Sequence, residues 1–159
     1  KLRLPQRGIF WDIGAGSGSV SIETARLCPE IEVIAVEKDE EQINNIKANK
    51  MTFNTKNIGI IEGEAPEALR GLPSPDRVFI GGGSGSLKEI ISIINKAMTS
   101  GIIVINATKI DTLNAAINQL KVSGFLIDIS QVSISRTKEI GDGQYLSALN
   151  PVFIIKGER

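Results

Sequence analysis

A glycine-rich turn near the start of the chain is the feature that most constrains its fold. The segment Trp11-Asp12-Ile13-Gly14-Ala15-Gly16-Ser17-Gly18-Ser19 follows an apolar run and precedes a helical pattern. Glycine tolerates positive φ and carries no Cβ, so this spacing predicts a strand that turns tightly into a helix. In such a turn the bare backbone can approach a ligand closely.

The turn differs from a dinucleotide-binding fingerprint in two ways. Ser19 stands where the third glycine of Gly-x-Gly-x-x-Gly is required. The carboxylate of Asp12 would also repel a neighbouring diphosphate. The turn therefore suits a nucleoside ligand that carries a positive charge and no phosphate, and S-adenosylmethionine is the ligand of that kind that we expect.

Short apolar runs and helical patterns alternate along the chain. Strands are predicted at residues 9–13, 31–36, 58–61, 76–80 and 102–105, with helical segments at 19–27, 39–53, 66–69, 87–98 and 110–122. Two further strands, at 125–135 and 152–155, follow without a helix between them. We expect an α/β, doubly wound, Rossmann-like fold with a mostly parallel seven-stranded sheet and a C-terminal antiparallel hairpin. Residues 1–159 are interpreted as one domain.

Acidic residues follow two of the predicted strands, at the sheet edge where ligands bind in this fold class. Glu37 comes about twenty residues after the glycine turn, where an acid holds the two hydroxyls of a ribose. The alternative is an ordinary acidic helix start. Glu64 could accept from an adenine amino group, together with the turn that Gly63 and Ala65 form around it. Its alternative role is capping of the helical turn that begins at Pro66.

The substrate side is predicted at the ends of the later strands. Gly81 and Gly82 open a glycine-rich loop that would let a flat, bulky substrate approach the methyl donor, although a merely flexible connection is the alternative. Asn106 ends the strand at 102–105, where an asparagine is often only a helix cap. Arg136 is a candidate for binding a substrate carboxylate, with solvated surface charge as the alternative.

The composition excludes several functional classes. Eighteen basic residues balance eighteen acidic ones in a chain of 159, so no net charge favours nucleic acid or a membrane surface. No histidine is present, which removes imidazole catalysis and histidine metal sites, and we expect no metal. The single Cys28 and the lack of a membrane span or signal peptide predict a cytoplasmic protein. Methyl transfer needs mainly in-line positioning, so no catalytic residue is assigned.

Four segments together resemble one family. They are residues 11–23, Glu62-Gly63-Glu64-Ala65-Pro66, Val78-Phe79-Ile80-Gly81-Gly82 and Leu149-Asn150-Pro151-Val152-Phe153-Ile154-Ile155. The chain is similar, over nearly its whole length, to the CbiT-type decarboxylating methyltransferases of cobalamin biosynthesis, which also occur as the C-terminal part of larger CobL-type proteins. The glycine turn alone indicates only a class I methyltransferase, whereas the last two segments are more specific.

The resemblance implies an S-adenosylmethionine-dependent enzyme that methylates carbon 15 of a precorrin or cobalt-precorrin, with loss of carbon dioxide from the acetate on carbon 12. It places the cofactor on Gly14, Ala15, Gly16, Gly18, Glu37 and residues 63–65, and the substrate on Gly81, Gly82 and Asn106. It also implies a homotetramer and a separate CbiE-type methyltransferase acting on carbon 5. Such proteins usually have more chain before the position of Lys1, so we expect a missing N-terminal segment.

Three other interpretations remain open from the sequence. A class I methyltransferase could act on RNA or protein, although balanced charge argues against an RNA substrate. A nicotinamide-dependent dehydrogenase is disfavoured by Ser19 and Asp12. A non-catalytic methyltransferase-fold subunit would explain a missing N-terminal segment, but the complete set of cofactor candidates argues against it.

Overall fold

The computed structural model describes residues 1–81 and 86–159 and shows strands and helices in alternation. The first part contains β1 (Arg7–Ile13), α1 (Ser19–Leu27), β2 (Glu30–Glu37), α2 (Glu40–Thr52), β3 (Ile58–Glu62), the 3-10 helix η1 (Glu67–Leu69), β4 (Arg77–Ile80), α3 (Leu87–Ala97), β5 (Ile102–Ala107) and α4 (Ile110–Val122). The C-terminal part is all strand, with β6 (Leu126–Val132), β7 (Ser135–Ile140), β8 (Gly143–Ala148) and β9 (Val152–Glu158). Within the described ranges, no helix combines the length and apolar character needed to cross a membrane.

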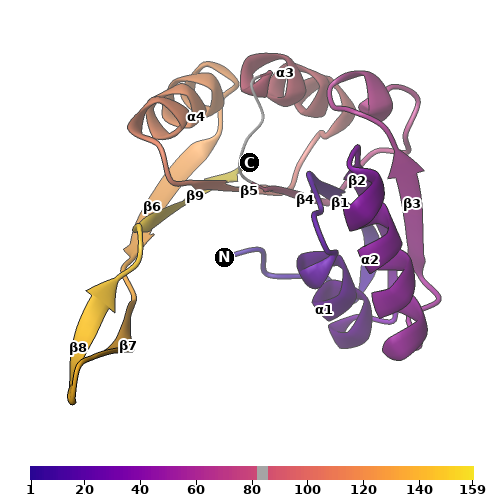
Figure 1. Ribbon diagram of the computed structural model, residues 1–159. Helices are drawn as coiled ribbons and strands as arrows, with labels where there is room; N and C mark the ends of the chain where they lie inside the picture. Colours follow the sequence, from indigo (N-terminus) through magenta and orange to yellow (C-terminus); the bar gives the residue numbers. More distant parts are fainter. Residues whose placement is uncertain (82–85) are drawn as a thin grey trace.

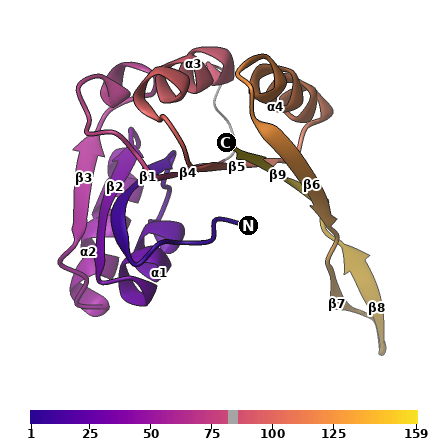
Figure 2. The same ribbon diagram turned by 180° about the vertical axis from the view of Figure 1, so that it is seen from behind.

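A seven-stranded sheet in the order β3-β2-β1-β4-β5-β9-β6 forms the centre of the molecule. Strands β1 to β5 pair in parallel, while β9 inserts between β5 and β6 and is antiparallel to both. Helices α1 and α2 cover one face of the sheet and α3 and α4 cover the other (Figures 1 and 2). The predicted α/β fold, with its mostly parallel sheet and closing antiparallel strand, is confirmed.

Alternating side chains of the strands build two separate cores. In β1, Phe10 packs with Ile22 of α1 and Ile46 of α2, whereas its neighbour Trp11 belongs to the cluster under α3 and α4. Phe10 and Trp11 are both completely buried. Because successive strand residues point to opposite faces, a strand that is covered on both sides is apolar throughout. This explains the short continuous apolar runs in the sequence.

The strand order reverses direction between β1 and β4. From β1 the chain proceeds outward through β2 and β3, and it then crosses back to place β4 on the other side of β1. A crevice forms at such a switch point, outside the carboxyl ends of the strands, and ligands bind there in open α/β sheets. The glycine turn that follows β1 lies at this point.

The predicted strand at residues 125–135 is wrong in its extent. Strand β6 ends at Val132, and Ser135 begins β7, which forms a separate two-stranded antiparallel sheet with β8. This hairpin projects away from the layered body of the molecule (Figures 1 and 2). Every residue of β7 is exposed, so its sequence carries no burial pattern that would mark a strand. The last predicted strand is longer than expected, since β9 continues to Glu158.

Candidate functional site

The glycine turn is held open toward solvent at the carboxyl end of β1. Gly14, Gly16 and Gly18 all have positive φ, at 68°, 55° and 80°. The backbone N–H groups of Gly14 and Ala15 both donate to the carbonyl oxygen of Val36, at 2.9 and 3.1 Å, which anchors the turn to β2. A Cβ added at Gly14 or Gly16 would meet no atom of the described residues within 4 Å. These two glycines therefore leave open space beside the backbone, as a ligand cradle requires.

The third glycine of the turn has a packing role. A Cβ at Gly18 would lie 3.0 Å from the side chain of Ile46 in α2. Gly18 also occupies the N-cap position of α1, and its carbonyl accepts the first helical hydrogen bond from Ile22. It thus lets α1 begin close against α2, and it shapes the cradle indirectly.

Asp12 is a buried carboxylate beneath this turn. Its side chain is only 1% exposed, and Oδ2 accepts a hydrogen bond of 2.5 Å from the Ser21 hydroxyl on α1. The second oxygen, Oδ1, is buried and accepts no hydrogen bond from any residue that the structure describes. Burial raises the pKa of Asp12 from 3.8 to about 6, opposing the effect of the Ser21 hydrogen bonds, and the charge of Glu37 adds to the rise. A buried acceptor without a partner is costly unless a ligand satisfies it.

Glu37 ends β2 and faces the turn. Its Oε2 accepts from the backbone N–H of Gly16 at 2.8 Å, and its Oε1 accepts from the N–H groups of Lys38 and Asp39 at 2.8 and 3.0 Å. Each carboxylate oxygen can accept more than one hydrogen bond, so Oε2 retains capacity for a ligand hydroxyl. The backbone donors hold the carboxylate at the edge where ribose binding was predicted.

The turn after β3 lies next to the end of β2. The N–H of Gly63 donates to the carbonyl oxygen of Glu37 at 2.9 Å, while Ala65 packs against the larger core. The carboxylate of Glu64 lies 2.6 Å from the Lys38 ammonium group, and the pKa of Lys38 is raised by this hydrogen bond. Both side chains are more than half exposed, so the pair contributes little and can exchange for a ligand contact.

The predicted substrate residues do not lie together as the predicted cofactor residues do. The N–H of Gly81 donates to the carbonyl oxygen of Ile13 at 2.9 Å, and a Cβ there would lie 2.5 Å from the carbonyl oxygen of Gly14. Gly81 therefore packs directly on the glycine turn, while Gly82 lies outside the described residues. Asn106 is half-buried within β5 and precedes the last residue of that strand. Arg136 is exposed on β7 in the projecting hairpin, and it is paired with Ser147 rather than placed in a loop after a strand.

Sequence reasoning missed Ser21, the residue that contacts Asp12. Ser21 is completely buried on α1, between the glycine turn and the core. The only sequence signal is a small polar residue on the apolar side of a helix, adjacent to Ile22. A small polar residue at such a position commonly has no role beyond packing. The fold shows that the Ser21 hydroxyl donates to the Asp12 carboxylate, nine positions earlier in the sequence.

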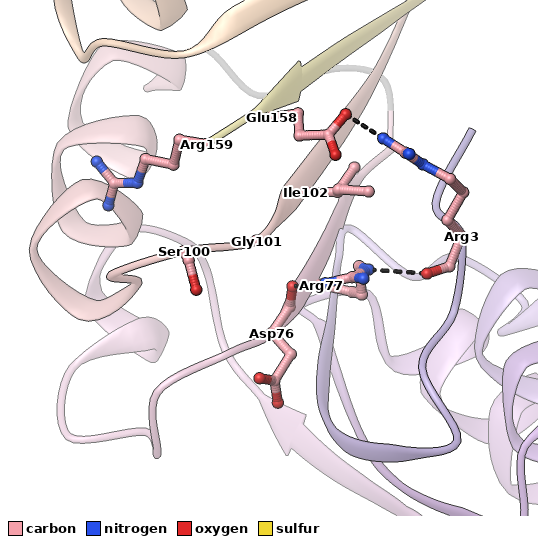
Figure 3. Close-up of a pocket in the computed structure, with 8 residues that line it drawn as sticks. All are labelled: Arg3, Asp76, Arg77, Ser100, Gly101, Ile102, Glu158 and Arg159. Atoms are coloured by element: carbon pink, nitrogen blue, oxygen red, sulfur yellow. Dashed lines mark hydrogen bonds and ion pairs between the residues drawn. The ribbon is translucent and has the colours of Figure 1, made fainter.

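A hollow of about 320 Å³ lies at the opposite edge of the sheet from the glycine turn, near the start of β4 and β5. Its lining residues are Arg3, Asp76, Arg77, Ser100, Gly101, Ile102, Glu158 and Arg159 (Figure 3). Arg3 pairs with Glu158, and Arg77 donates to the carbonyl oxygens of Leu2 and Arg3. These contacts tie the N-terminal segment to the sheet, so the charges of this hollow serve to hold structure.

The residues around the glycine turn fit an S-adenosylmethionine-like ligand. The Oδ1 of Asp12, which has no partner in residues 1–81 and 86–159, suits a cationic group, and the Glu37 carboxylate suits a pair of hydroxyls. The space that these residues leave at Gly14 and Gly16 accommodates the ligand between them. Strands β1 and β2, which are neighbours in the sheet, and the turn after β1 supply these groups. The arrangement can bind a nucleoside with a positive charge without any phosphate-binding contact.

Comparison with known proteins identifies the family. The family model described as "Precorrin methyltransferase domain" matches residues 1–159. A protein of Pyrobaculum calidifontis named "Probable cobalt-precorrin-6B C(15)-methyltransferase (decarboxylating)" is 38% identical over 157 residues, which cover 98% of this chain and 80% of that protein.

Solved structures agree with this comparison. The precorrin-6Y C5,15-methyltransferase of Geobacter metallireducens superposes with a TM-score of 0.91 at 40% identity, over 99% of this chain and 83% of that one. A SAM-dependent O-methyltransferase of Thermotoga maritima, 17% identical, shares the fold with a TM-score of 0.76 over 99% of this chain and 61% of that one. The chain has the fold of S-adenosylmethionine-dependent methyltransferases, and it belongs to the precorrin methyltransferase family.

Proposed function

We propose that this chain is an S-adenosylmethionine-dependent enzyme that methylates carbon 15 of a precorrin or cobalt-precorrin and releases carbon dioxide from the acetate side chain on carbon 12. The relatives' names support the cobalt-precorrin substrate, the methylation of carbon 15 and the decarboxylation. The structural observation that carries the cofactor assignment is the buried Oδ1 of Asp12, which has no partner among the described residues and lies beside an open glycine turn. That combination matches the cationic, phosphate-free cofactor that methyl transfer requires.

Different residues of the chain bind different parts of the cofactor. Asp12 accepts from the ammonium group of the methionine part, and Glu37 accepts from the two ribose hydroxyls. The backbone of Gly14, Ala15, Gly16 and Gly18 forms the floor, while the turn of Gly63, Glu64 and Ala65 borders the adenine. When bound, S-adenosylmethionine supplies a methyl group already activated by the neighbouring sulfonium. The protein then has to orient that methyl in line with the substrate carbon and exclude water.

The substrate is a polycarboxylate ring that would lie beyond the ends of β4 and β5. We assign Gly81, Gly82 and Asn106 to this side, with Arg136 as a contact for a peripheral carboxylate. Gly81 directly follows β4, which pairs with β1, and Asn106 lies near the end of β5, which pairs with β4. An electron-rich ring carbon needs little deprotonation, which is compatible with a chain that contains no histidine. We assign no residue to the decarboxylation.

A homotetramer and a cytoplasmic location belong to the same proposal, as does association with a CbiE-type enzyme that methylates carbon 5. The projecting β7–β8 hairpin supports self-association, because Ile140 and Leu146 are 67% and 72% exposed on it. A two-stranded hairpin without a covering surface is only marginally stable in water. The free thiol of Cys28 is compatible with a reducing compartment.

The first test is isothermal titration of the protein with S-adenosylhomocysteine, using NADH and ATP as controls. We expect micromolar binding of S-adenosylhomocysteine alone. Incubation with cobalt-precorrin-6B and methyl-labelled S-adenosylmethionine should then yield equal amounts of methylated product and carbon dioxide. Binding of NADH in preference to S-adenosylhomocysteine would contradict the cofactor assignment, and methylation without carbon dioxide release would contradict the decarboxylating reaction.

A further inference from the structure

The buried hydrogen bond between Ser21 and Asp12 affects the cofactor site as well as the packing of α1. The Ser21 hydroxyl lies 2.5 Å from Oδ2 of Asp12, and both residues are almost completely shielded from solvent. The hydroxyl donates, because an ionised carboxylate can only accept. This leaves one carboxylate oxygen bound to the protein and the other, Oδ1, without a partner among the described residues.

Among the described residues, Ser21 is the one whose hydrogen bonds favour the charged form of Asp12. In the sheet it stands beside Ala35 of β2 and Phe79 of β4, neither of which is charged. The charged group that acts on it is Glu37, whose like charge disfavours ionisation. From α1, the contact comes from Ser21. Hydrogen bonds to the charged form favour that form, so Ser21 is the residue that opposes burial and the Glu37 charge.

We propose that Ser21 is a positioning residue of the cofactor site: its hydroxyl holds one oxygen of the ionised Asp12 carboxylate, so that Oδ1 remains free to accept from the ammonium group of the cofactor. The inference rests on the proposed function, because it assigns a ligand group to Oδ1. Ser21 itself has its hydroxyl occupied by Asp12, and it acts on the ligand only through that carboxylate.

The first readout needs no ligand. The carboxyl carbon of Asp12 is titrated by NMR in the wild type and in Ser21→Ala, with Ser19→Ala as the matched control. Ser19 is an exposed serine on the same helix, and its hydroxyl bonds to Ser17. We expect Asp12 to titrate at higher pH in Ser21→Ala than in the wild type. In Ser19→Ala it should titrate at the same pH as in the wild type. An unchanged Asp12 titration in Ser21→Ala would overturn the proposal.

The second readout is the affinity for S-adenosylhomocysteine at two pH values. We expect Ser21→Ala to bind about tenfold more weakly than the wild type at pH 6.5, and within about twofold at pH 8.5, where the carboxylate is ionised in both proteins. Affinity lowered by the same factor at both pH values would show a merely structural role and overturn the proposal. If the wild type itself fails to bind, the cofactor assignment fails, while the ligand-free titration still reports on Ser21.

A second variant keeps the test decisive if Ser21→Ala folds poorly. Ser21→Thr retains the hydroxyl but adds a buried methyl group. We expect it to preserve the wild-type titration of Asp12 and the wild-type dependence of affinity on pH, whatever its thermal stability. A shift in Ser21→Thr as large as that expected for Ser21→Ala would mean that packing at this position, and not the hydroxyl, controls Asp12.

Discussion

The Glu37 carboxylate accepts a hydrogen bond of 2.8 Å from the backbone N–H of Gly16. Two features that lie 21 positions apart in the sequence therefore meet directly. The carbonyl oxygen of Val36, one residue earlier in β2, holds the N–H groups of Gly14 and Ala15. The end of β2 thus organises the glycine turn before any ligand binds, and the predicted ribose-binding acid is already oriented by that contact.

Replacing Glu37 by Gln should weaken cofactor binding without unfolding the protein. The amide keeps one acceptor oxygen, but its NH₂ group only donates, so a neutral side chain with a single acceptor replaces the carboxylate that would accept from two ribose hydroxyls. Hydrogen bonds to charged groups contribute about 1.5–3 kcal/mol, so we expect a loss of about 10- to 100-fold in affinity for S-adenosylhomocysteine by calorimetry. Glu40→Gln, on the exposed start of α2, is the control. Unchanged affinity in Glu37→Gln would remove Glu37 from the site.

Comparing Gly16→Ala with Gly124→Ala should separate the effect of backbone strain on stability from the effect of an added Cβ on ligand binding. Gly16 and Gly124 both have positive φ, at 55° and 79°, and an added Cβ meets no described atom within 4 Å at either position. Each alanine variant should therefore lose about 1–2 kcal/mol of stability from strain. Only Gly16→Ala should also lose affinity for S-adenosylhomocysteine, because its Cβ would occupy the space proposed for the ligand. Equal affinities in the two variants, measured by calorimetry, would place the ligand elsewhere.

Alanine at Gly81 should disturb the cofactor side as well as the substrate side. Its Cβ would lie 2.5 Å from the carbonyl oxygen of Gly14, and that atom belongs to the backbone and cannot rotate away. We expect a loss of about 1–3 kcal/mol in the free energy of unfolding, together with weaker binding of S-adenosylhomocysteine. Gly59→Ala in β3, where the nearest atom is 3.8 Å away, should change neither quantity. Full stability in Gly81→Ala, measured by urea denaturation, would contradict this close packing.

The sequence predicts the layered fold well because that fold depends on local patterns. Apolar runs such as Ile102–Ile105 mark strands that are buried on both faces, and the spacing in Leu87–Ala97 marks a helix that is buried on one. The β7–β8 hairpin escapes prediction because exposed strands carry no such pattern.

Parts of the site escape prediction for a different reason. The hydrogen bond from Ser21 to Asp12 and the ion pair of Glu64 with Lys38 depend on how distant segments pack. Motif spacing predicts that Asp12, Glu37 and Glu64 share one edge of the sheet. It cannot show which oxygen of a carboxylate is already occupied, nor that Gly81 touches the turn after β1.

The raised pKa of Asp12 should make stability depend on pH in a defined direction. The folded protein holds this carboxyl proton with a pKa of about 6, whereas the ordinary pKa of an aspartate, which applies in the unfolded chain, is 3.8. The stabilisation from this proton is fully present below about pH 4 and is lost as the pH rises through about 6.

Asp12→Asn carries no such proton, so it serves as the reference. Between pH 5 and pH 7.5 we expect the wild type to lose about 1.4 kcal/mol relative to Asp12→Asn in urea denaturation, whatever the absolute cost of the amide. Other titrating groups are common to both proteins and cancel in this difference. A difference that does not change with pH would mean that Asp12 titrates normally in the folded protein.

The β7–β8 hairpin should control the state of association. Leu146 pairs with Thr137 on one face of the hairpin, and Ile140 pairs with Gly143 on the other, so both faces present an exposed apolar side chain. We expect Ile140→Ser combined with Leu146→Ser to lower the molar mass measured by light scattering, from that of a tetramer to that of a smaller species. Met51→Ser on α2, where the side chain is 79% exposed, removes a comparable apolar group away from the hairpin and should leave the mass unchanged. If the double variant remained a tetramer, association would not depend on these two apolar side chains and would have to use another surface.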